Sequence, residues 1–392
     1  MKTKTQLFSN FIFLVILAVL SFAVSSCQSV SKQNKGSRTQ WDFHPVWVQN
    51  TLANPNTGFR KINRMTPLIY KDQIIVGNSI DGLVCYNLNS RQEMWRILIP
   101  QGIEASAAII NDRLFAGSQN GKVYSIDLSK GQILWTFDTK SEVVAEPLLN
   151  DGVLYFISGS QSVFALDASS GKQLWTYNRQ DTSSLMTVRG GAKPALSDGS
   201  LYFGFSDGSV VSLNAKTGTP QWEITLNRNT RFKDIDASPV VSGDMLFISS
   251  YDDKVYAVSK KKGEIIWKSQ FGGASAPLVF SDRLIVASSK GDLASLSKKD
   301  GSVIWKIKTN QGIYTEPTLL KGSILVGETQ GRILLLDGLT GEQRTSFEPG
   351  RGVFTKASIS ADQSMVYFVS NEGNLYGLNL VAKDNSSVYY LK

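Results

Sequence analysis

The sequence is poor in the residues on which many enzymes depend. It has 392 residues but a single histidine, His44, and two cysteines, Cys27 and Cys85. Catalytic triads and zinc sites usually need histidine or clustered cysteines, so we expect no catalytic site, no metal site and no cofactor. The net charge of +8 is spread along the chain without a basic block, which argues against nucleic-acid binding.

The only long apolar run lies at the N-terminus. Lys2 and Lys4 precede residues 11–24, which are apolar except for Ser21. This run is short for a membrane span and has the length of a signal-peptide core. It ends in Val-Ser-Ser-Cys-Gln, residues 24–28, which resembles the lipobox of bacterial lipoproteins.

The lipobox resemblance implies that residues 1–26 are removed and that Cys27 becomes a lipidated N-terminus carrying palmitate. More than one acyl chain would give a stable membrane anchor. Gln28 after the cysteine, in place of aspartate, favours the periplasmic face of the outer membrane. The alternative is a soluble secreted protein in which Cys27 is incidental.

A repeat organises the rest of the chain. Residues 27–40 are polar and typical of a flexible tether, and residues 41–392 contain a recurring unit of about forty residues with four short strands. Six copies have a small residue ten positions before a tryptophan, as with Ser125 and Trp135. In the seventh copy Thr345 replaces the tryptophan, and the eighth copy is incomplete.

This pattern predicts an all-β fold, an eight-bladed β-propeller. We expect the strand around Trp47 to complete the last blade by pairing with residues 375–380, which would leave no open edge. The tryptophans are interpreted as packing between blades, and Cys85 as a buried small side chain.

The repeat G-x-V-Y-x-L-D-x-x-x-G-x-x-x-W resembles that of the PQQ-like repeat propellers. That fold is shared by pyrroloquinoline quinone (PQQ) dehydrogenases and by BamB, a lipoprotein family of the outer-membrane β-barrel assembly (Bam) machinery. The resemblance to BamB covers essentially the whole mature chain. It implies a non-enzymatic scaffold that binds the periplasmic domains of BamA, works with other Bam subunits and assists the folding and insertion of nascent outer-membrane β-barrels.

Two connections between copies are longer than the others. Successive tryptophans are 40 residues apart from Trp95 to Trp175, but 47 and 45 residues apart from Trp175 to Trp222 and from Trp222 to Trp267. The extra residues include Met-Thr-Val-Arg-Gly and Asp-Ile-Asp-Ala-Ser-Pro, which resemble the segments with which BamB holds BamA. This likeness implies a partner-binding set of Met186, Val188, Arg189, Asp234 and Asp236.

In that set the apolar pair would fill a shallow pocket of the partner, and Arg189 would make a forked contact. The aspartates would pair with basic side chains or orient Arg189. Alternatively, Arg189 and Asp236 bridge to each other and only fix two long loops.

Three functions remain open at this stage. The Bam scaffold is the first, and exposed strand edges could also pair with client strands. The second is a PQQ-dependent dehydrogenase, which needs a central calcium held by carboxylates and often has a vicinal disulfide that this chain lacks. The third is a propeller lipoprotein that binds another envelope protein or a polysaccharide.

Overall fold

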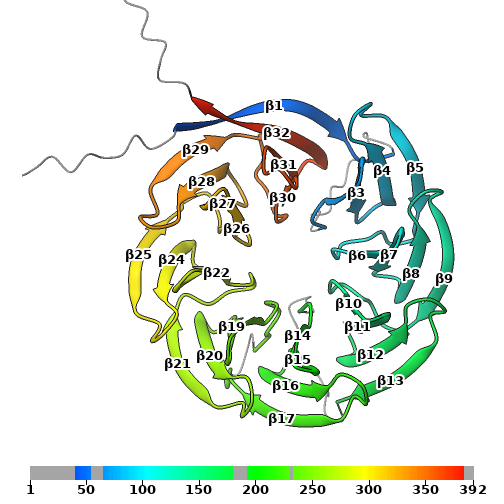
Figure 1. Ribbon diagram of the computed structural model, residues 1–392, viewed down its shortest axis with the longest axis vertical. Helices are drawn as coiled ribbons and strands as arrows, with labels where there is room; N and C mark the ends of the chain where they lie inside the picture. Colours follow the sequence, from blue (N-terminus) through cyan, green and yellow to red (C-terminus); the bar gives the residue numbers. More distant parts are fainter. Residues whose placement is uncertain (1–39, 54–64, 180–191, 230–232, 384–392) are drawn as a thin grey trace, which may run out of the picture. The chain divides into compact units, whose positions relative to one another are not determined.

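The structure is a computed structural model that describes residues 40–53, 65–179, 192–229 and 233–383. Trp41–Lys392 forms one compact unit. Its described part consists of eight antiparallel sheets of four strands each, arranged as a ring of blades around a central axis (Figure 1). The predicted eight-bladed β-propeller is therefore confirmed.

Seven blades are continuous in sequence and run from a short strand near the axis to a strand at the rim. Blades 1 to 4 comprise β2 (Leu68–Tyr70), β3 (Gln73–Asn78), β4 (Gly82–Asn87) and β5 (Glu93–Leu98); β6 (Ala108–Ile110), β7 (Arg113–Gly117), β8 (Lys122–Asp127) and β9 (Gln132–Asp138); β10 (Leu148–Asn150), β11 (Val153–Ile157), β12 (Ser162–Asp167) and β13 (Gln173–Asn178); and β14 (Ala195–Ser197), β15 (Ser200–Gly204), β16 (Ser209–Asn214) and β17 (Pro220–Thr225). Blades 5 to 7 comprise β18 (Val240–Ser242), β19 (Met245–Ser250), β20 (Lys254–Ser259) and β21 (Ile265–Gln270); β22 (Leu278–Phe280), β23 (Arg283–Ala287), β24 (Asp292–Ser297) and β25 (Val303–Lys308); and β26 (Thr318–Leu320), β27 (Ser323–Gly327), β28 (Ile333–Asp337) and β29 (Gln343–Phe347).

The two ends of the propeller meet in blade 8. Its strand order is β1 (Gln40–Asn50), β32 (Asn374–Lys383), β31 (Met365–Val369) and β30 (Ser358–Ile359), so the N-terminal strand lies at the rim beside the C-terminal one (Figure 1). The predicted closure is confirmed. Trp47 is 7% exposed and its ring meets Tyr86 of blade 1 edge to face, with centroids 5.7 Å apart. Because β1 is the outermost strand, Pro45 costs no internal ladder hydrogen bond.

The recurring spacing of ten residues between the small residue and the tryptophan has a simple structural cause. In each of blades 1 to 6 the small residue lies directly opposite the tryptophan on the neighbouring strand, for example Ser125 opposite Trp135, and the register shifts immediately after it. A small side chain leaves room on that face for the large ring, while the shift re-aims the following residues.

Each of these tryptophans joins its blade to the next. Its indole N–H donates to a backbone carbonyl in the turn between the two outer strands of the following blade, as Trp95 does to Leu128 at 2.8 Å. Three residues after that carbonyl, the turn glycine lies against the ring. The interpretation of the tryptophans as packing between blades is confirmed.

Thr345 stands where blade 7 would carry its tryptophan, and the reason lies in the following blade. In blade 8 the two outer strands, β32 and β1, come from opposite chain ends and are not joined by a turn. There is consequently no turn carbonyl or turn glycine for an indole to meet. Thr345 Oγ1 instead lies 3.4 Å from Asp42 Oδ1 of β1.

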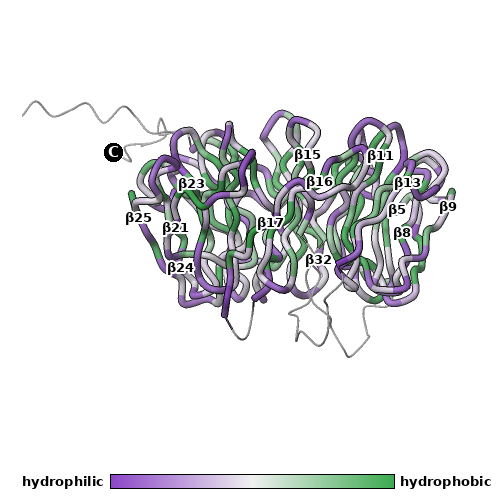
Figure 2. The backbone as a smooth tube through the Cα atoms, turned by 90° about the horizontal axis from the view of Figure 1, so that it is seen from below, coloured by the Kyte–Doolittle hydropathy of each residue, from purple (hydrophilic) through white to green (hydrophobic). Residues whose placement is uncertain are grey.

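The antiparallel course of every blade defines two faces. Outer strands end, and the next inner strands begin, on the same face, which we call the loop face; it also carries the turns between second and third strands. The opposite face, the turn face, carries the other hairpin turns, the start of β1 and the end of β32. Seen edge-on, hydrophobic residues concentrate inside the blades and hydrophilic residues in the turns (Figure 2).

Candidate functional site

Of the residues predicted to bind a partner, only Asp234 and Asp236 belong to the described part of the chain. Met186, Val188 and Arg189 lie outside the described residues, as does Cys27. The two long connections lead into and out of blade 4: one joins β13 to β14 and the other joins β17 to β18. The described ends of both connections therefore lie on the loop face.

Arg179 holds the start of the first connection against blade 4. It directly follows β13, and its Nη2 lies 2.7 Å from both Asp207 Oδ2 and Glu223 Oε1. Its guanidinium carbon lies over the Phe205 ring, 4.7 Å from the ring centroid. The four residues at the same repeat position of blades 1, 2, 4 and 6 are uncharged and buried: Ile99, Thr139, Leu226 and Thr309. Arg179 thus marks the start of this connection as a specialised junction.

Asn227, the second residue of the second connection, is fully buried. Its Nδ2 donates to the Lys233 carbonyl at 3.1 Å and to Ser250 Oγ at 3.2 Å. Further along, the backbone N–H of Ile235 donates to the Phe205 carbonyl at 3.2 Å. These bonds attach the described part of the connection to blades 4 and 5.

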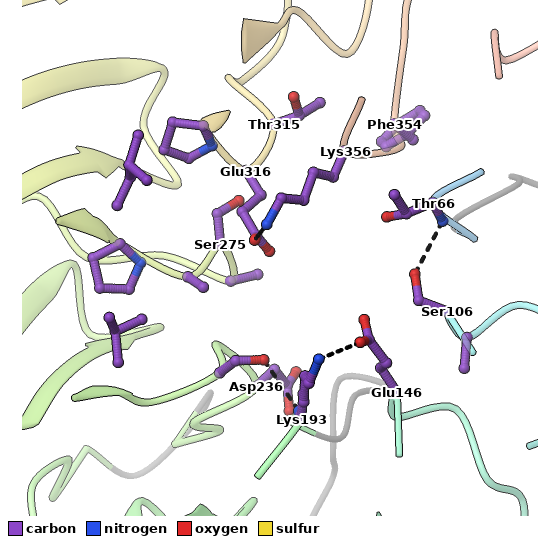
Figure 3. A pocket seen from close by; sticks show the side chains of 18 of the residues that line it. Thr66, Ser106, Glu146, Lys193, Asp236, Ser275, Thr315, Glu316, Phe354 and Lys356 are labelled. Carbon is purple, nitrogen blue, oxygen red and sulfur yellow. Dashed lines mark hydrogen bonds and ion pairs between the residues drawn. The ribbon is translucent and has the colours of Figure 1, made fainter. Parts of the chain in front are cut away.

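The two predicted aspartates occupy different environments. Asp234 is 1% exposed, and its carbonyl accepts a hydrogen bond of 3.3 Å from the backbone N–H of Tyr251. Asp236 lies two residues further on and lines a cavity on the propeller axis, close to Lys193 (Figure 3). The structure therefore places Asp236 on an accessible surface and Asp234 behind it.

The axial cavity has a volume of about 930 Å³ and receives residues from all eight blades. Most of its lining comes from residues just before or within the innermost strands, so the cavity lies toward the loop face. It contains carboxylates, ammonium groups, hydroxyls and apolar side chains, among them Glu146, Lys193, Ser106 and Phe354 (Figure 3).

One column of the repeat forms a ring of side chains in this cavity. The column lies two residues before each inner strand and reads, over blades 1 to 8, Thr66, Ser106, Glu146, Lys193, Ser238, Ala276, Glu316 and Lys356. The order of two small residues, a glutamate and a lysine thus occurs twice, once in each half of the ring. Aligning the repeats over their inner strands reveals this column from the sequence, whereas the outer strands carry no sign of it.

Neighbouring members of the column are linked across blade boundaries. Lys193 Nζ contacts Glu146 Oε1 and Lys356 Nζ contacts Glu316 Oε1, forming two ion pairs (Figure 3). The hydroxyl of Ser106 accepts a hydrogen bond of 3.0 Å from the backbone N–H of Thr66. The hydroxyl of Ser238 accepts one of 3.1 Å from the backbone N–H of Lys193. Side chains at the axis consequently help to set the spacing between blades.

Other reactive groups in the described residues have structural surroundings. Cys85 is fully buried opposite Trp95, and burial raises the pKa of its thiol to about 12, with the charge of Asp72 contributing. His44 is exposed on β1. Within the described ranges, no three His, Cys, Asp or Glu side chains cluster closely enough to hold a metal ion. The same ranges include no helix able to span a membrane.

Comparison with known proteins identifies the family. The family model described as outer membrane protein assembly factor BamB matches residues 79–258 and 251–382. The chain belongs to the BamB family. The match spans the repeats from the second strand pair of blade 1 to the end of blade 8. No curated protein sequence matches the chain.

Solved structures share the fold across this family and beyond it. BamB from Moraxella catarrhalis is 21% identical with a TM-score of 0.73, and the match covers 86% of this chain and 99% of that chain. The quinohemoprotein alcohol dehydrogenase from Comamonas testosteroni is 11% identical with a TM-score of 0.71, covering 86% of this chain and 76% of that chain. The designed Ika8 protein is 14% identical, with a TM-score of 0.68 and coverage of 81% and 96%. The fold alone therefore does not separate scaffold from enzyme.

Proposed function

We propose that this protein is a lipid-anchored periplasmic scaffold of the Bam machinery. It binds the periplasmic domains of BamA, works beside other Bam subunits and assists the folding and insertion of β-barrel proteins, without catalysing a reaction. Membership of the BamB family supports the assembly role. The observation that supports the docking site is that the described ends of both long connections meet blade 4 on one face and are attached there by Arg179 and Asn227.

In this proposal the docking surface consists of the first connection together with Asp236. Met186 and Val188 supply apolar contacts and Arg189 supplies a forked hydrogen-bonding group. Asp236, at the accessible edge of the axial cavity, pairs with a basic group of the partner or with Arg189. Asp234 is buried, so its role is to orient neighbouring groups rather than to touch BamA.

Co-purification with BamA tests this surface. Replacing Arg189 by Gln together with Asp236 by Asn is expected to abolish capture of BamA from detergent-solubilised membranes. The matched control is Arg344→Gln, which removes an arginine that pairs with Asp337 at 2.8 Å on the turn face. Unchanged capture by the double variant, or equal loss in the control, would reject the assigned surface.

Anchoring is tested separately. Signal peptide 1–26 and lipidation of Cys27 predict that the mature protein fractionates with the outer membrane and that its N-terminal peptide carries acyl chains. Cys27→Ser is expected to release the protein into the soluble periplasmic fraction. Membrane association that survives this change would show that lipid at Cys27 is not the anchor.

A further inference from the structure

The two ion pairs on the propeller axis occupy equivalent positions of the repeat although they lie half a ring apart. Glu146–Lys193 joins blades 3 and 4, and Glu316–Lys356 joins blades 7 and 8. Both lysine side chains are 39% exposed, and the glutamates are 29% and 32% exposed. Each pair therefore presents one carboxylate and one ammonium group, side by side, to the same cavity (Figure 3).

Holding the blades together does not require these charges. At the same level of the ring, the junction of blades 1 and 2 uses the hydroxyl of Ser106, and the junction of blades 4 and 5 uses that of Ser238. Partly exposed ion pairs add little stability, typically less than about 1 kcal/mol. Their repetition at two places that face one cavity points to a ligand.

Each pair retains hydrogen-bonding capacity toward the cavity. A lysine ammonium has three donors and a carboxylate can accept about four hydrogen bonds, and pairing uses only part of either. The carboxylate can accept a hydrogen bond from a peptide N–H, and the ammonium group beside it can donate one to a peptide C=O. N–H and C=O groups lie next to each other along the edge of an extended peptide. An extended peptide exposes that pattern on both of its edges.

We propose that the axial cavity binds a segment of extended polypeptide through its backbone. One edge of the segment faces Glu146 and Lys193, and the other faces Glu316 and Lys356. Backbone N–H groups donate to the glutamates, and backbone carbonyls accept from the lysines. The blades contain strands of five or six residues, so about six extended residues, roughly 20 Å, would span their depth.

The remaining lining leaves room for an extended backbone. Small side chains such as Ala105 and Ala274 leave space without imposing a shape. Three of the described lining residues are aromatic: Tyr314 is 3% exposed, whereas Tyr251 and Phe354 are half-buried, so a saccharide is tested as a competitor of the peptide. A site that binds the backbone rather than the side chains can accept unfolded chains of varied sequence. This inference goes beyond docking to BamA, because its four charged residues are not among those assigned to BamA binding, although Lys193 lies at the described end of the first connection.

Fluorescence anisotropy with the full-length protein in detergent micelles tests the proposal. The probe is an end-capped peptide of alternating valine and serine, about six residues long, labelled with fluorescein. We expect saturable binding to the wild type. E146Q/K193Q and E316Q/K356Q are each expected to weaken it by a similar factor, roughly tenfold, because each removes charged partners of backbone groups.

Several results would overturn the proposal. The variant with all four substitutions should lose binding, whereas K71Q/D112N, which removes an ion pair of 2.7 Å between blades 1 and 2 on the turn face, should not. Equal binding by the fourfold variant would refute the site, as would displacement of the peptide by maltohexaose. Circular dichroism establishes that each variant is folded.

A second measurement uses only the unaltered protein. The same peptide carrying a benzophenone side chain should crosslink to cavity residues such as Val144 or Phe354. Crosslinks confined to the rim strands would refute axial binding. Since BamA takes no part in either assay, failure of BamA capture and failure of peptide binding are distinguishable.

Discussion

The contact between each outer tryptophan and the turn glycine of the following blade predicts unequal effects of one substitution at two positions. Gly263 and Gly322 both have φ of +71°, so replacement by alanine imposes the same backbone cost at each. A Cβ at Gly263 would lie 2.7 Å from Trp222 Cε3, whereas a Cβ at Gly322 would meet no atom within 4 Å. The two variants therefore separate the close contact from the backbone conformation.

The expected free energies follow from these two contributions. A non-glycine residue in the left-handed region costs about 1–2 kcal/mol, and this is the only cost expected in the folded state of Gly322→Ala. Gly263→Ala adds an overpacking cost of about 1–3 kcal/mol, because the indole is a rigid neighbour that must shift. Loss of conformational freedom in the unfolded chain is the same for both and cancels in the comparison.

Urea unfolding followed by tryptophan fluorescence provides the measurement. The free energy of unfolding of Gly263→Ala should be lower than that of Gly322→Ala by about 1–3 kcal/mol, with a similar m-value for both variants. Adding Trp222→Ala to Gly263→Ala should abolish this excess, because the obstructing ring is gone. Equal stability of the two single variants would refute the argument that the glycine column exists to admit the tryptophan of the preceding blade.

Four further predictions concern closure, loop support, pH and the thiol. Trp47→Ala should cost about 3–5 kcal/mol in urea unfolding, because this buried ring joins the N-terminal strand to blade 1; a loss below about 1 kcal/mol would contradict closure by β1. A double-mutant cycle of Arg179→Gln and Glu223→Gln should give a coupling of about 0.5–1 kcal/mol, and zero coupling would show that the 2.7 Å contact does not support the first connection. Hydrogen bonds from Ser169 and Ser170 lower the pKa of Asp167 to about 2; since this lies below the value in an unfolded chain, the stabilisation is complete above about pH 4 and is lost as the pH falls toward 2, and NMR titration of the Ser169→Ala/Ser170→Ala variant should return the pKa toward its ordinary value. Cys85, buried and with its pKa raised to about 12, should resist thiol reagents at pH 8 until urea unfolds the blades, and rapid native labelling at this residue would refute the burial.

Repetition explains why most of the fold could be predicted from the sequence. The small residue, the tryptophan ten positions later and the turn glycine recur in register, and each strand pair is local in the chain. Even the closing strand was predictable, because the last copy lacked an outer strand and Trp47 supplied the missing tryptophan. The reason for threonine in place of tryptophan at position 345 was not predictable, because it lies in the absence of a turn in the neighbouring blade.

The candidate sites divide in the same way. The spacing of the tryptophans determined where the two long connections occur, and likeness to BamB assigned residues to them. Only the tertiary structure placed Asp236 on the axial cavity and Asp234 behind it, although the two are separated by one residue.

What the sequence determined alone is the local repeat, the number of blades and the strand that completes the ring, because these depend on residues close together or on a missing part of a known unit. What the tertiary structure decided is which side chains meet at the axis. Glu146 and Lys193 are 47 positions apart, and the two ion pairs are separated by about half the chain. Closure of the ring brings them into one cavity, because a propeller turns a column of the repeat into a circle of neighbours.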